Sequence, residues 1–217
     1  TLGIVGESGC GKSVTAKSLL RLLEKVGRIE PGSKVEFEGR DVLAMDTAEL
    51  SAYRGTDVGM IFQDPMTSLD PVFKVGYQMV ENLLAHRDMT RKEAWDISVE
   101  ALRSVGIPQP EARMEAYPFE LSGGMCQRVI IAMALCCNAK LIIADEPTTA
   151  LDVTVQAQVL DLLKDLQRKT GMALLLITHN LGVVWKMCDR VMVMYAGKVV
   201  ESAATEELYQ NPLHPYT

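Results

Sequence analysis

The stretch from Gly6 to Ser13 has the residue types and the spacing of a phosphate-binding loop. Its residues read GESGCGKS, fit the pattern G-x-x-x-x-G-K-[ST] and follow the short apolar segment Leu2–Val5. Glycines let a backbone turn its N–H groups toward phosphate oxygens, and the start of a following helix adds partial positive charge. Lys12 can then neutralise the outer phosphates, and the Ser13 hydroxyl can bind Mg²⁺. A solvated lysine on a glycine-rich turn is the plainer interpretation, but the flanking strand and helix patterns favour the loop.

Two adjacent carboxylates, Asp145 and Glu146, follow the unbroken apolar run Leu141–Ala144. An acidic residue at the C-terminal end of a buried strand can hold a Mg²⁺-bound water, and we assign that part to Asp145. Glu146 is then placed to orient or deprotonate an attacking water. A polar strand end that merely faces solvent is the alternative. It explains the pair less well, because two adjacent carboxylates repel each other unless a cation or proton relieves them.

Gln63 and His179 also come just after apolar segments, as do Gly6 and Asp145. Alone, each of the first two is a weak signal, since a lone histidine is more often structural or exposed. In an open α/β sheet, however, the ligand site lies outside the carboxyl ends of the strands. One sheet would therefore gather all four residues around one phosphate chain.

A serine followed by two glycines, Ser122-Gly123-Gly124-Met125, precedes the helical pattern through Val129. Serine at a helix start is a common N-cap, and a helix N-terminus also binds anions. By itself the segment indicates an ordinary cap. Because the other motifs occur in the same chain, we favour a second interpretation, in which this helix start supplies further anion-binding donors.

Strand and helix patterns alternate along the chain around these residues, as expected for a parallel sheet covered by helices. The segment from Asp64 to about Pro118 differs, because long helical patterns dominate it, and we expect no helix between the last hairpin and Thr217. The expected strands are Leu2–Val5, Val35–Phe37, Val58–Phe62, Leu141–Ala144, Ala173–Ile177 and a hairpin of Val191–Tyr195 with Val199–Glu201. The expected helices are Lys12 to about Val26, Val75–His86, Arg91–Val105, one through Val129–Cys137, and Val153–Lys169.

Composition describes a globular chain of 217 residues with 48% hydrophobic and 23% charged residues. The net charge of -6 gives no basic field that would indicate nucleic acid. The longest apolar run, Val129–Cys137, is too short to span a bilayer. The cysteines are odd in number and form no CxxC pair, which favours reduced cytosolic thiols over disulfides or a zinc site. They are Cys10, Cys126, Cys136, Cys137 and Cys188.

Taken together, the ordered motifs resemble the ATPase subunits of ABC transporters along the whole chain. The match runs through the phosphate loop, a Q-loop at Gln63, a signature at Leu121–Met125, the acidic pair, a D-loop at Ala150–Asp152 and a switch histidine at His179. Met125 stands where the common signature has Gln, and Cys126 stands where Arg is common. Three further stretches resemble the oligopeptide and dipeptide importer branch: Ile61–Leu69, Asp145–Val155 and the closing segment Asn211–Thr217, which reads NPLHPYT. The closing segment fits no motif that ATP chemistry demands.

The resemblance implies the fold class: an α/β P-loop NTPase with a mostly parallel sheet flanked by helices, a small antiparallel β part and an inserted helical subdomain. It implies a nucleotide-binding core formed by residues 1–63 and 138–217, with a helical signature subdomain at 64–137. It also implies ATP as cofactor, bound by the loop and by the residue after it: Gly6, Glu7, Ser8, Gly9, Cys10, Gly11, Lys12, Ser13 and Val14.

Further roles follow from the same resemblance. Mg²⁺ would be held by Ser13, Gln63 and Asp145, while Glu146, His179 and Gln63 would serve hydrolysis. A second ATPase subunit, usually a related chain, would pair head to tail with this one. ATP would then be clamped between the loop of one subunit and the signature of the other, with Asp152 in the D-loop. The signature contacts would come from Ser122, Gly123, Gly124 and Met125.

The implied partners are transmembrane permease subunits and, indirectly, an extracytoplasmic peptide-binding protein, with no nucleic acid. The implied location is peripheral, on the cytoplasmic face of the bacterial inner membrane. In the family, an aromatic residue upstream of the loop stacks on adenine and a Cys-bearing extension follows the closing segment. We expect this chain to be a fragment that lacks both parts, and to bind ATP weakly because the adenine-stacking residue is missing.

Other function classes remain alternatives. Importer ATPases for nickel or other small solutes are close relatives of the peptide branch. A soluble chromosome-type ABC ATPase would carry long coiled coils, but only 58 positions separate Gln63 from Leu121, without sustained heptads. A P-loop kinase or GTPase would not explain the Ser122 segment or the closing one. A regulatory ATP-binding module without turnover would not need Glu146 and His179.

Overall fold

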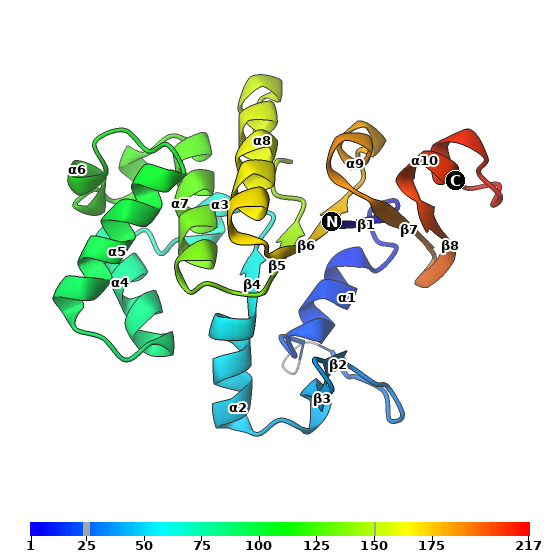
Figure 1. Cartoon of the computed structure of the whole chain (residues 1–217), viewed down its shortest axis with the longest axis horizontal. Coiled ribbons are helices and arrows are strands. Elements are labelled where there is room, and N and C mark those ends of the chain that lie inside the picture. The colour runs from blue at the N-terminus through cyan, green and yellow to red at the C-terminus, as the bar shows by residue number, and fades with distance from the viewer. Residues whose placement is uncertain (24–26, 150) are drawn as a thin grey trace. The chain divides into compact units, whose positions relative to one another are not determined.

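A computed structural model describes residues 1–23, 27–149 and 151–217 of the chain, and it divides them into two compact units. The terminal unit joins Thr1–Arg54 with Leu174–Thr217, and the middle unit is Gly55–Ala173. Figure 1 labels their elements, and each unit is described by itself. The sequence-predicted division at residues 63 and 138 differs from these units and stays a prediction.

The terminal unit is built on a mostly parallel sheet in the order β6-β1-β7-β8. Strand β1 (Leu2–Val5) pairs in parallel with β6 (Ala173–Thr178) and with β7 (Arg190–Tyr195), while β8 (Lys198–Ala204) returns antiparallel to β7. The central strands are apolar on both faces, as helix-covered parallel strands must be. Leu176 and Ile177 of β6, for example, are fully buried.

The terminal unit contains helices of which the first and third in chain order begin at or just after predicted site residues. They are α1 (Lys12–Leu19), α2 (Thr47–Ala52), α9 (Leu181–Met187) and α10 (Thr205–Gln210). Strands β2 (Glu36–Phe37) and β3 (Arg40–Asp41) form a small antiparallel ribbon, and a 3₁₀ turn spans Val42–Ala44. The mostly parallel sheet and the antiparallel β part confirm those parts of the predicted fold class.

Two predictions for helices in this unit are wrong. The sequence pattern predicts a first helix that runs to about Val26, but the helix ends at Leu19, because Arg21 adopts a positive φ of 50°. Arg54 stabilises this early end by donating to the carbonyls of Leu20 and Arg21, at 2.8 and 2.9 Å. Residues 24–26, where the predicted helix would end, lie outside the described residues.

The second correction is α10, in a segment for which the sequence pattern predicts no helix. Glu206 and Glu207 in its first turn suit the positive end of the helix dipole, and Leu208 is buried. The signal is present in the sequence as two acids before an apolar residue, but the helix is only six residues long.

The middle unit contains a pair of parallel strands, β4 (Val58–Ile61) and β5 (Leu141–Asp145), and most of the helices. The helical character expected from Asp64 to about Pro118 is confirmed. Two of the predicted helices are found almost residue for residue, at Val75–His86 and Arg91–Ser104. The helices are α3 (Pro65–Ser68), α4 (Val75–His86), α5 (Arg91–Ser104), α6 (Pro110–Met114), α7 (Gly123–Cys136) and α8 (Val153–Thr170).

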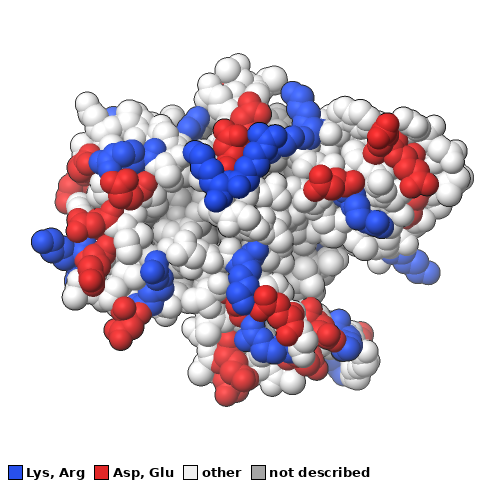
Figure 2. Space-filling view, in the orientation of Figure 1, with Lys and Arg blue, Asp and Glu red and all other residues white. Residues whose placement is uncertain are grey.

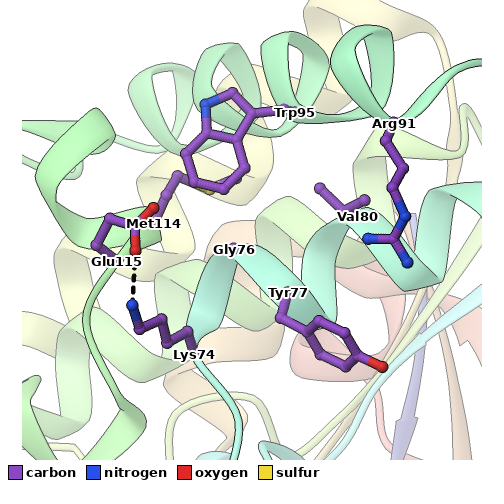
Figure 3. A pocket seen from close by; sticks show the side chains of 8 residues that line it. All are labelled: Lys74, Gly76, Tyr77, Val80, Arg91, Trp95, Met114 and Glu115. Atoms are coloured by element: carbon purple, nitrogen blue, oxygen red, sulfur yellow. Dashed lines mark hydrogen bonds and ion pairs between the residues drawn. The ribbon is translucent and has the colours of Figure 1, made fainter.

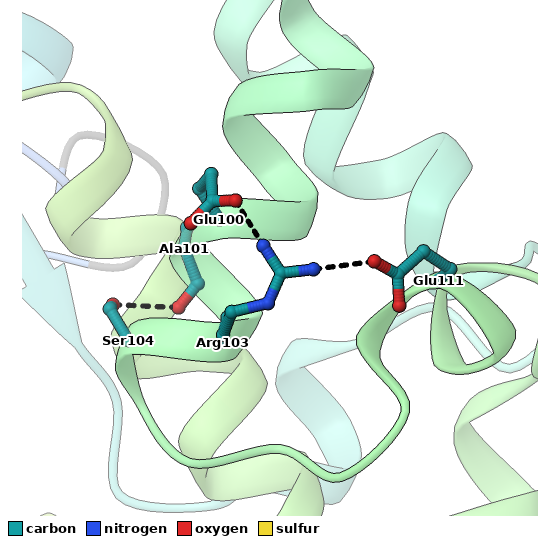
Figure 4. Close-up of polar contacts among 5 residues, drawn as sticks. All are labelled: Glu100, Ala101, Arg103, Ser104 and Glu111. Carbon is teal, nitrogen blue, oxygen red and sulfur yellow. Dashed lines mark hydrogen bonds and ion pairs between the residues drawn. The ribbon is translucent and has the colours of Figure 1, made fainter.

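Local signals explain why these helices begin and end where they do. Thr90 and Glu93 form a reciprocal capping box at the start of α5, and Gly171 in a left-handed conformation ends α8. Helix α5 packs against both α4 and α7. On its exposed side Arg103 bridges Glu100 of the same helix and Glu111 of α6 (Figure 4). Surface pairs of this kind contribute little stability.

Charged side chains of both signs are interspersed over the face that Figure 2 displays. Among the described residues, none of the helices has the length and apolar character needed to cross a bilayer.

Candidate functional site

The phosphate loop is formed by the terminal unit, between the end of β1 and the start of α1. Gly6 lies so close to β7 that a β-carbon there would be 2.2 Å from the carbonyl oxygen of Met194. Any larger residue would push the loop off the strand. The hairpin turn after β7 supports the loop as well, since the Gly197 N–H donates to the Cys10 carbonyl at 3.0 Å.

The ammonium of Lys12 lies over this loop, and the residue is 5% exposed. Its Nζ donates to the carbonyl oxygens of Gly6 and Glu7, at 2.8 and 2.9 Å. Lys12 is also the first residue of α1, which Gly11 enters with a positive φ of 107°. The loop therefore presents a fixed cation and a helix N-terminus on the same short segment, as an anion site requires.

His179 belongs to the same unit and follows the strand next to β1. Val5 of β1 is paired with Thr178 of β6, so Gly6 and His179 leave the sheet from neighbouring carboxyl ends. Asn180 then caps α9, with its side chain accepting from the Val183 N–H at 3.3 Å. The structure thus brings the loop and the histidine to one end of one sheet, as the sequence predicts for open α/β sheets.

The carboxylate pair is held in the middle unit at the end of β5. Ile61 of β4 pairs with Ala144 of β5, which places Gln63 and the acidic pair at the same end of the two strands. Asp145 and Glu146 are only 3% and 8% exposed. Gln63 Nε2 donates to Glu146 Oε2 at 3.2 Å, so two predicted site residues are in direct contact.

Thr149 holds the same carboxylate, and the sequence pattern alone does not single it out. Its hydroxyl donates to Glu146 Oε2 at 2.8 Å, and its N–H donates to the Glu146 carbonyl at 3.2 Å. The backbone of Glu146 has a φ of 47°, a conformation that costs a non-glycine residue about 1–3 kcal/mol. The hydrogen bonds of the turn stabilise this conformation, and it fixes the direction of the carboxylate.

The signature and the D-loop residue lie together in the middle unit, at two adjoining helix starts. The Ser122 side chain caps α7 by accepting from the Met125 N–H at 3.3 Å, and Asp152 caps α8 by accepting from the Val155 N–H at 2.9 Å. A β-carbon on Gly124 would be 2.8 Å from Val155 Cγ1. Gly124 thus lets the two helix starts approach each other. Ala150 of the expected D-loop lies outside the described residues.

The predicted site residues therefore fall into two groups. Gly6–Ser13, Val14 and His179 belong to the terminal unit, where Val14 is exposed on α1. The other group belongs to the middle unit: Gln63, Asp145, Glu146, Ser122, Gly123, Gly124, Met125 and Asp152. In the middle unit, Gln63 is in contact with Glu146, and Gly124 of the signature lies against the helix that Asp152 caps.

Two other features are distinct from these groups. A surface hollow of about 290 Å³ lies among α4, α5 and α6, between the side chains of Tyr77 and Trp95, and no predicted site residue lines it (Figure 3). The five cysteines are buried and unpaired. Burial raises the pKa of the Cys188 thiol to about 12, so this thiol stays protonated at neutral pH.

The side-chain oxygens of Ser13, Gln63 and Asp145 are of the chemical kinds that bind Mg²⁺. A hydroxyl, an amide and a carboxylate are hard ligands, and Mg²⁺ is commonly bound by one or two carboxylates together with substrate phosphates. Among the described residues there is no cluster of three or more His, Cys, Asp or Glu side chains that could form an all-protein metal cage. Ser13, Gln63 and Asp145 remain the residues predicted to bind the cation.

Comparison with known proteins identifies the family. The sequence profile described as ABC transporter matches residues 1–149, and the chain belongs to this family. It is 52% identical over its whole length to the oligopeptide transport ATP-binding protein OppD of Bacillus subtilis, covering 61% of that protein. It is 51% identical over its whole length to the dipeptide transport ATP-binding protein DppD of Haemophilus influenzae, covering 65% of it.

Solved structures show the same fold. A dimeric ATP-binding cassette in a post-hydrolysis state, bound to ADP and Pi, matches 94% of this chain over 84% of its own, with a TM-score of 0.79 and 27% identity. The cbiO1 subunit of the cbiONQ complex from Clostridium perfringens matches 97% of this chain over 79% of its own, also with a TM-score of 0.79 and 27% identity. The predicted ABC ATPase fold is confirmed.

Proposed function

We propose that this chain binds and hydrolyses ATP to power a peptide importer. The observation that carries the proposal is the identity of 51–52% along the whole chain to relatives named for oligopeptide and dipeptide transport. The chain spans 61–65% of the length of those two relatives. The activity, substrate and partners of the whole protein are therefore all part of the proposal.

In this account the terminal unit binds the phosphates. Backbone N–H groups of the loop from Gly6 to Ser13, and that of Val14 in the first turn of α1, surround the outer phosphates. Lys12 exchanges its contacts with the loop carbonyls for phosphate oxygens. The exchange is favourable because a charge-assisted bond to phosphate is stronger than one to a neutral carbonyl. His179 contacts the γ-phosphate from the neighbouring strand.

Glu146 of the middle unit takes the proton of the attacking water. Its contacts support this role, since Gln63 and Thr149 fix one carboxylate oxygen, Oε2, by hydrogen bonds. A carboxylate has about four acceptor sites, so it can accept from a water in addition to these donors. Mg²⁺, when bound, neutralises charge on the phosphates, and Ser13, Gln63 and Asp145 are the residues that would hold it.

We propose that the functional unit is a head-to-tail dimer with a second, related ATPase chain. Ser122, Gly123, Gly124 and Met125 would serve the nucleotide held by the partner's loop, with Asp152 beside them. The contact of Gly124 with Val155 supports this role, because it ties the signature to the start of the D-loop helix. A cassette of this fold has been solved as a dimer.

The remaining proposals concern the membrane. The dimer would bind transmembrane permease subunits on the cytoplasmic face of the bacterial inner membrane, and an extracytoplasmic peptide-binding protein would deliver the substrate. Residues 64–137 would form the helical subdomain that receives the permease, with 1–63 and 138–217 as the nucleotide-binding core.

The test is to purify the full-length protein with its membrane partners and reconstitute the complex in lipid. ATP hydrolysis is then measured with the binding protein loaded with dipeptides, with longer peptides, or with a nickel complex. Peptides should stimulate hydrolysis. Stimulation by the nickel complex alone would assign the chain to a metal importer. ATP hydrolysis that needs no membrane partner and that no solute stimulates would favour a soluble ATPase.

A further inference from the structure

The closing segment Asn211–Thr217 lies against the phosphate loop in the terminal unit. The N–H of Glu7, the second residue of the loop, donates a hydrogen bond to the Tyr216 hydroxyl oxygen at 2.8 Å. The two residues are 209 positions apart in the chain. The closing segment, which belongs to no ATP-binding motif, is therefore in direct contact with the backbone of the phosphate loop.

Tyr216 is held in this position by its aromatic ring. The ring packs on Tyr195, the last residue of β7, with 4.6 Å between the ring centroids and 43° between the planes. Tyr195 directly follows Met194, whose carbonyl lies against Gly6. Tyr216 thus connects β7 to the phosphate loop: its ring packs on Tyr195, and its hydroxyl accepts from the Glu7 N–H.

The rest of the segment is anchored to β8 through one carboxylate. Glu201 accepts hydrogen bonds from the N–H groups of Leu213 and His214, at 2.8 and 3.1 Å. His214 Nδ1 in turn accepts from the Tyr216 N–H at 3.1 Å, and the Thr217 N–H donates to the His214 carbonyl at 2.9 Å. The segment is a hydrogen-bonded turn with a fixed shape, and this turn aims the tyrosine at the loop.

We infer that Tyr216 is a positioning residue for nucleotide binding, which braces the phosphate loop through the Glu7 N–H and leaves the chemical step to other residues. This inference rests on the proposed ATP-binding function. A loop that binds phosphate with backbone N–H groups must hold those groups in a convergent arrangement, and each fixed group lowers the ordering cost of binding. Glu7 is exposed, and its carbonyl already accepts from Lys12 Nζ and from the Cys10 N–H, at 2.9 and 3.2 Å. The Tyr216 hydroxyl adds a partner for the N–H of the same residue, so both backbone groups of Glu7 are fixed.

The inference predicts a specific effect of Tyr216→Phe in the assembled transporter. The phenylalanine keeps the ring on Tyr195 and removes only the hydroxyl. We expect KM for ATP to rise about two- to tenfold, the usual worth of one hydrogen bond, with kcat within a factor of about two. Hydrogen–deuterium exchange in a peptide covering the loop should become faster at the same time.

Tyr209→Phe is the matched control, because it removes a tyrosine hydroxyl of the same unit that donates to the Leu181 carbonyl and not to a residue of the loop. It should leave KM and loop exchange unchanged. Glu201→Ala, which removes the anchor of the segment, should move both quantities in the same direction as Tyr216→Phe.

An unchanged KM and unchanged loop exchange in Tyr216→Phe would overturn the inference. So would equal effects of Tyr209→Phe, since these would show a general loss of stability. The exchange measurement is independent of turnover. If the wild-type complex failed to hydrolyse ATP, the proposed function would fall while faster loop exchange in Tyr216→Phe would still show the brace.

Discussion

The side-chain amide of Gln63 donates a hydrogen bond to the carboxylate of Glu146, with 3.2 Å between Nε2 and Oε2. The two residues follow neighbouring parallel strands, β4 and β5, and the strand register brings them together. Gln63 lies one residue before the start of the helical region at Asp64, so a displacement of that region would be felt at the carboxylate. This contact links the proposed general base to the part of the chain that we propose receives the permease.

Thr149 should matter for turnover because its hydroxyl fixes the Glu146 carboxylate. Thr149→Val keeps the shape and removes the donor, and we expect kcat for ATP hydrolysis to fall about three- to tenfold, consistent with one hydrogen bond. Thr149→Ser retains the hydroxyl and should stay within about twofold of wild type. The measurement is kcat for ATP hydrolysis by the assembled transporter, compared between the Val and Ser variants. If Val and Ser variants turn over alike, the hydroxyl has no part in positioning Glu146.

Gly124 should resist substitution because of Val155. Gly124→Ala places a methyl group 2.8 Å from Val155 Cγ1, and such overpacking typically costs about 1–3 kcal/mol of the free energy of unfolding. Gly123→Ala is the control, since nothing lies within 4 Å of the point that its β-carbon would occupy and alanine is the better helix former. Urea denaturation measures the free energy of unfolding of both variants.

The double variant Gly124→Ala with Val155→Ala completes the test. Removing the valine methyl groups should relieve the clash, so the double variant should unfold at a higher urea concentration than additivity of the single variants predicts. Strict additivity would show that the two side chains do not compete for the same space.

Ser122 should act on the nucleotide of the other subunit. In a mixed dimer, Ser122→Arg in this chain should silence the site built on the partner's loop lysine, by on the order of a hundredfold for a lost transition-state donor. The site built on Lys12 should keep its activity. Site-specific photolabelling or trapping of the two nucleotides distinguishes them, and a defect confined to the Lys12 site would rule out the trans arrangement.

Local patterns predict most of the elements because short-range signals determine them. Helix α4 has the predicted bounds, and α5 differs by one residue at its end. The end of α1 is different, because it depends on a contact that no local pattern contains. Arg54, which stabilises that early end, lies more than thirty positions away in the chain.

The site shows the same division between local and distant information. The sequence alone predicts the phosphate loop, the carboxylate pair and the Ser122 cap, because each is a short motif with its own chemistry. Thr149 lies within a recognised motif but gives no sign of bonding to Glu146, since that bond depends on the positive φ of Glu146. Tyr216 cannot be placed on the loop from sequence, because 209 positions separate it from Glu7.

The measurement that tests the account most directly is ATP turnover by the reconstituted transporter carrying Glu146→Gln, with ATP affinity measured on the same preparation. Loss of a general base typically costs about two orders of magnitude or more, so kcat should fall at least about a hundredfold while the affinity for ATP is retained. A Glu146→Gln complex that hydrolyses ATP within a few-fold of wild type would contradict the assignment of this chain as an ATPase whose carboxylate at the end of β5 performs the chemistry.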